Sequence, residues 1–162
     1  MEVRSIFGLP AHPLIVHVVV VLLPLAAVTL IVAALVPRAR RIAAPLALGL
    51  ALVSTAAVLG AEQSGEVLQG QVKETTLVRD HTRAADEVLP WAIGVVLVAL
   101  GVTFAEPARR RLGKPSPRVA NVIVVTLSLI VGVGATAVVI DVGHSGAKAT
   151  WDNTANLPVR DR

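Results

Sequence analysis

The chain of 162 residues is 54% hydrophobic and only 16% charged, with a mean hydropathy of +0.73. A soluble domain this apolar would expose a large hydrophobic surface to water, so the composition predicts one integral membrane domain covering residues 1–162. The net charge of +4 comes with only 2% aromatic residues and no cysteine. These values argue against a nucleic-acid partner and exclude disulfides, thiolate metal sites and thioether-linked haem.

Four apolar runs without charged residues cover 14–36, 42–61, 88–105 and 119–140. Their lengths are 23, 20, 18 and 22 residues. A helix needs about 20 residues to cross a hydrocarbon core, so each run is long enough to span a bilayer. The sequence therefore predicts an all-α fold, an up-down bundle of four transmembrane helices, with the lipid bilayer as its surroundings.

The basic residues are concentrated in two of the connections. Loops 37–41 and 106–118 hold eight of the 15 Lys and Arg residues but only one acidic residue, Glu106. The positive-inside rule places such loops in the cytoplasm. We therefore predict a multi-pass protein of the plasma membrane with both termini and the 62–87 connection outside. Trp91 and Trp151 fall at the outer ends of the third and fourth runs, where tryptophan anchors helices at the interface.

The connection between the second and third runs contains further helical structure. Gly65 and Gly70 suggest where the second helix stops. A threonine cap at Thr75 or Thr76 predicts that the third helix begins near residue 76, before its apolar run. Small residues recur inside the spans, among them Gly60, Gly94 and Gly134, and favour either close helix packing or space for a flat cofactor. No internal repeat is convincing.

The four histidines are the main candidates for chemistry. They are His12, His17, His81 and His144, and the predicted topology places all of them on the outer side. Imidazole is a common metal ligand and can be an axial ligand of haem iron. Acidic and hydroxyl residues gather on the same side, and these either orient ligands or form a solvated rim. They are Glu62, Glu66, Asp80, Asp141 and Ser145.

No nucleophile elbow, P-loop or H-E-x-x-H motif is present. This favours an electron-transfer component over an enzyme with bond-making chemistry.

The opening stretch Gly8-Leu9-Pro10-Ala11-His12-Pro13-Leu14-Ile15-Val16-His17, His81 before the third run, and Gly143-His144-Ser145-Gly146-Ala147 with Trp151 form a recognisable set. Together they resemble the uncharacterised four-pass bacterial membrane family catalogued as domain of unknown function 2231. The resemblance covers nearly the whole chain and implies a four-helix membrane protein. The position of His144 varies in that family, which makes it the weakest ligand candidate.

The leading interpretation is a membrane protein that binds haem b near its outer face and passes electrons to a redox partner. His17 and His81 are the expected ligands, with His12 as the substitute for either and His144 as the fourth candidate. Gly60, Gly94 and Gly134 would then admit the porphyrin edge. A Zn²⁺ or Cu²⁺ site built from His12, His17, His81 and a carboxylate is a further option. The alternative is a cofactor-free structural or accessory subunit of a larger membrane complex. The sequence does not specify the oligomeric state.

Overall fold

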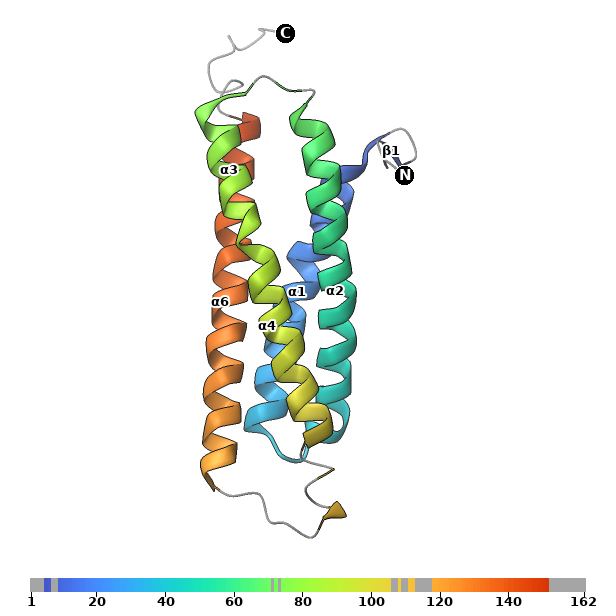
Figure 1. Cartoon of the computed structure of the whole chain (residues 1–162), viewed down its shortest axis with the longest axis vertical. Coiled ribbons are helices and arrows are strands. Elements are labelled where there is room, and N and C mark those ends of the chain that lie inside the picture. Colours follow the sequence, from blue (N-terminus) through green and yellow to red (C-terminus); the bar gives the residue numbers. More distant parts are fainter. Residues whose placement is uncertain are drawn as a thin grey trace, which may run out of the picture.

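A computed structural model of the chain is a bundle of four long helices standing side by side (Figure 1). The structure describes residues 5–6, 9–70, 72, 74–105, 108, 111–112 and 118–151. The elements in chain order are β1 (Ser5–Ile6), β2 (Leu9–Pro10), α1 (Ala11–Leu35), α2 (Arg40–Gln69), α3 (Thr76–Asp86), α4 (Val88–Leu100), the π-helix η1 (Gly101–Ala105) and α6 (Arg118–Trp151). The two short strands pair antiparallel just before α1.

Four helices are long and apolar enough to span a membrane, which confirms the all-helical four-span prediction. Helices α2 and α6 have 30 and 34 residues. At 1.5 Å per residue they are about 45 and 51 Å long, longer than a hydrocarbon core of ~30 Å. Their apolar runs end before their charged residues begin, so both helices continue past the predicted spans. Gly65 lies inside α2, and Gly70 is its C-cap.

The third spanning helix is built from three consecutive segments. Helix α3 begins at Thr76, and the Thr75 side chain caps it by accepting a hydrogen bond from the Val78 backbone N–H at 3.3 Å. Glu87 links α3 to α4, which continues into the π-turn η1. No side chain of α3 is buried, whereas α4 buries four. The apolar part of this helix therefore begins at α4.

The helices are ordered α1, α2, α4 and α6 around the bundle. Helix α1 packs against α2 and α6, and α4 packs against the same two helices, so α1 and α4 are diagonal partners. Among the residues that the structure describes, most of the buried ones are alanines, and only Leu23, Leu30 and Val95 are large apolar side chains without exposure. Small side chains allow helices to approach closely in a membrane, where van der Waals contact holds them together.

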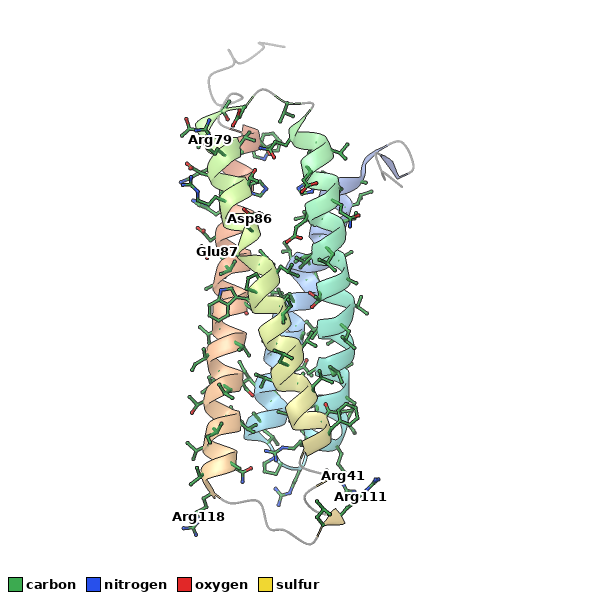
Figure 2. The ribbon with its side chains drawn as sticks, in the orientation of Figure 1. Arg41, Arg79, Asp86, Glu87, Arg111 and Arg118 are labelled. Atoms are coloured by element: carbon green, nitrogen blue, oxygen red, sulfur yellow. The ribbon has the colours of Figure 1, made fainter. Side chains whose placement is uncertain are left out.

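The two ends of the bundle differ in charge (Figure 2). Arg41, Arg111 and Arg118 lie at one end, called here the arginine end. Arg79, Asp86 and Glu87 lie toward the other, called the histidine end for reasons given below. At the arginine end, Arg40 donates hydrogen bonds to the carbonyls of Ala33 and Ala34, which lack helical partners at the end of α1. The assignment of this end to the cytoplasm stays a prediction, and most of loop 106–118 lies outside the described residues.

Candidate functional site

His12 is held by the end of α2. It is the second residue of α1, and its Nδ1 atom lies 3.0 Å from the Ala61 carbonyl oxygen and 3.4 Å from the Ser64 hydroxyl. The ring fits against Gly65, where an added Cβ would lie 3.1 Å from its Cε1 atom. A carbonyl oxygen can only accept a hydrogen bond, so this contact assigns the proton of a neutral His12 to Nδ1. The Nε2 atom then carries a free lone pair.

His81 is held by α6 in the same way. Its Nδ1 atom lies 3.2 Å from the Ser145 hydroxyl, and that hydroxyl donates its single proton to the Val142 carbonyl at 3.0 Å. With its proton directed to Val142, the Ser145 oxygen presents a lone pair to Nδ1 of the ring. The ring fits against Gly146, where a Cβ would lie 3.0 Å from Cε1. Here too the proton is assigned to Nδ1 and Nε2 is free.

These two arrangements repeat one motif, which we call the imidazole cradle. It consists of a backbone carbonyl, a serine three residues later and a glycine after that serine. The first cradle is Ala61, Ser64 and Gly65, and the second is Val142, Ser145 and Gly146. The serines and glycines were not singled out together from the sequence, because only a Ser-Gly pair is shared by the two segments. That pair, at the outer end of two successive helical hairpins, is the signal that was available.

The cradles hold His12 and His81 at the same end of the bundle, on helices at opposite corners. Burial, and after it the nearby charge of His12, lowers the pKa of His81 below its ordinary value. Glu62 of α2 interacts through charge with Asp86 of α3 and with Glu66 of its own helix. Polar groups from three helices therefore meet at the histidine end. Among the described residues, no three His, Asp or Glu side chains are close enough to hold a metal ion together.

His17 and His144 lie on the outside of the bundle. His17 is exposed, and its Nδ1 atom is 2.6 Å from the Pro13 carbonyl of its own helix. His144 is exposed on α6, in the part of the helix that continues beyond the predicted span 119–140. The structure thus brings His81 together with His12, the predicted substitute ligand, and not with His17. All four histidines lie at the end opposite Arg41, Arg111 and Arg118.

Side chains of neighbouring helices fill the space beside the three glycines expected to admit a porphyrin edge. Ile15 fills the space beside Gly60, and Val131 fills the space beside Gly94. The Trp91 ring lies directly against Gly134, where an added Cβ would overlap it. Side chains of neighbouring helices therefore take up the space beside all three glycines, and their role in admitting a porphyrin edge stays a prediction. Trp91 is half-buried in this contact, while Trp151 is exposed at the last residue of α6.

Comparison with known proteins identifies one family. The family model described as "Predicted membrane protein (DUF2231)" matches residues 8–156, which include both cradles and all four helices. No curated protein matches the chain, and no solved structure matches it.

Proposed function

The chain belongs to this family of predicted membrane proteins, and from its site geometry we propose that it binds haem b between His12 and His81 and acts in electron transfer. The observation that carries the proposal is a pair of imidazoles, His12 and His81, held at the same end of the bundle on diagonal helices. Each has Nδ1 engaged by a neighbouring helix and Nε2 free. A ligating imidazole typically donates its other N–H to a carbonyl or similar group, which fixes the ring and raises its basicity.

The number of available ligands supports haem over a metal ion. Protein zinc sites use three or four protein ligands, whereas haem iron is completed by axial ligands above and below the ring. Within the described part of the chain, the histidine end offers the imidazoles of His12 and His81 and no group of three ligands. These two residues, on diagonal helices, are the ones that would hold the iron.

The residues around the pair suggest how they would serve such a cofactor. Haem would supply a reversible one-electron couple. His12 and His81 would hold its iron, and the rigid helices behind them would limit movement of the ligands between oxidation states. Because the pair lies at one end of the bundle, a partner could approach it from the water.

Absorption spectroscopy of the purified protein tests the proposal. We expect a Soret band with a low-spin spectrum, lost in His12→Ala and in His81→Ala. His17→Ala and His144→Ala are matched controls and should retain it, because both side chains are exposed and outside the pair. A correctly folded protein that stays colourless when supplied with haem would refute the proposal. Bound zinc or copper without haem, found by elemental analysis, would support the metal alternative instead.

A cofactor-free structural subunit is the second candidate. It is favoured by the glycines at the helix contacts, whose space is filled by side chains from neighbouring helices. In that case a variant lacking all four histidines should assemble normally with a stable partner complex. Failure of that variant to assemble, together with a Soret band in the parent protein, would count against it.

A further inference from the structure

We propose that the two cradles are a duplicated positioning device that keeps the proton of His12 and of His81 on Nδ1. Both rings are thereby presented with free Nε2 atoms before any ligand arrives. The identity of the ligand rests on the proposed function, but the protonation state of the rings does not. The inference therefore has a test in the protein without haem.

The hydroxyl bonds give the direction of each contact. Ser64 donates to the Ala61 carbonyl at 3.1 Å, and Ser145 donates to the Val142 carbonyl at 3.0 Å. Each serine proton is therefore used within its own helix, and the oxygen facing the ring can only accept. A carbonyl and a hydroxyl oxygen accept from His12, and a hydroxyl oxygen accepts from His81. Each cradle therefore stabilises an Nδ1 proton and disfavours a lone pair there.

The glycines set the position of the rings. Gly65 and Gly146 follow the cradle serines, and each contacts the Cε1 atom of its histidine. An alanine at either position would place a methyl group 3.0–3.1 Å from that atom, so the ring must move by a few tenths of an ångström. This shift would lengthen the bonds to the cradle oxygens, which weaken steeply as the geometry degrades.

If the glycines served only close helix packing, replacing one of them would not change the tautomer of a histidine. Gly143, on the same helix as the second cradle, has open space where its Cβ would be. Gly143→Ala is therefore a matched control for Gly146→Ala, since both replace a glycine in the same stretch of α6. Only the second substitution meets an imidazole.

Nitrogen NMR of ¹⁵N-histidine-labelled, haem-free protein in nanodiscs tests the inference. Above the pH at which the rings lose their charge, His12 and His81 should both show the Nδ1–H tautomer, with signals assigned from His→Ala variants. Gly65→Ala should alter the tautomer ratio at His12 alone, and Gly146→Ala that at His81 alone. Gly143→Ala should alter neither. A predominant Nε2–H tautomer at either ring of the unmodified protein overturns the inference, even if neither glycine variant folds.

The haem-loaded protein gives a second readout. Loss of an outer hydrogen bond to a metal-ligating histidine typically lowers metal affinity by about 10–100-fold. We expect weakening in this range for Gly65→Ala and Gly146→Ala, and no change for Gly143→Ala. Nδ1–H tautomers in a protein that never binds haem would disprove the proposed function but leave the positioning role intact. Haem binding by a protein whose rings lack these tautomers would overturn the positioning role and leave the proposed function intact.

Discussion

At the scale of single residues, the difference between His12 and His17 follows from helix geometry. With 3.6 residues per turn, two positions five apart point about 140° away from each other around the helix axis. His12 and His17 therefore cannot both face the bundle when the opening stretch is helical. The structure places His12 against α2 and leaves His17 exposed. Helix geometry alone therefore indicates that one of the two histidines faces the bundle. It does not indicate which one, because the apolar residues around His12 and His17 are similar.

Gly134 is the residue at which substitution should be most damaging. The Trp91 ring occupies the position of an added Cβ, so Gly134→Ala must displace a large side chain from a close helix contact. Overpacking of this kind typically costs about 1–3 kcal/mol. We expect a lower midpoint in a denaturation series in detergent. Gly49→Ala is the control, because nothing lies near its Cβ position and alanine is the better helix former. Equal stability of the two variants would contradict the packing.

At the scale of helices, apolar runs predicted the number and position of the spans but not their full length. The histidine ends of α2 and α6 carry glycines and charged residues, and Gly65 and Gly70 predicted an end of the second helix there. Both segments are helical. Gly65 and Gly146 give room for an imidazole of a neighbouring helix, and neither glycine ends the helix in which it lies. The role of these two glycines depends on a contact between helices, and a single sequence does not reveal that contact.

Helix α3 should be the least stable helical segment at the histidine end. It buries no side chain and depends on its cap, the Thr75 hydroxyl bonded to the Val78 amide. Replacing a threonine cap by alanine costs about 1 kcal/mol. In Thr75→Ala, hydrogen exchange of the α3 amides should therefore accelerate about five-fold, with α4 unchanged. Thr76→Ala is the neighbouring control and should leave exchange near the parent rate. Unchanged exchange in both variants would show that the cap does not hold α3.

At the scale of the whole molecule, the two cradles relate the halves of the chain. The first hairpin is α1 and α2, and the second is α3, α4 and α6. Exchanging one hairpin for the other preserves every helix contact around the bundle and interchanges His12 with His81. The sequence did not reveal this relation, because membrane helices of Val, Leu and Ala look alike at any alignment. In the sequence, a Ser-Gly pair and a histidine in each half are the signs of this relation.

The orientation of the bundle in the membrane follows from its charge asymmetry. Arginines gather at one end, while the other carries acidic and basic residues together (Figure 2). Cytoplasmic loops carry the excess of Lys and Arg, so the histidine end should face outward. The chain has no cysteine, and single cysteines can therefore be introduced as unambiguous labels.

A membrane-impermeant maleimide should label Glu74→Cys in intact cells, because Glu74 is exposed in the connection between α2 and α3. Leu112→Cys should react only after the cells are permeabilised, because Leu112 is exposed and follows Arg111, which lies at the arginine end. Both positions lie outside the apolar spans, so neither label enters the bilayer. The opposite pattern would place the imidazole pair on the cytoplasmic side and require a redox partner there. Labelling of both sites in intact cells would be incompatible with spanning helices.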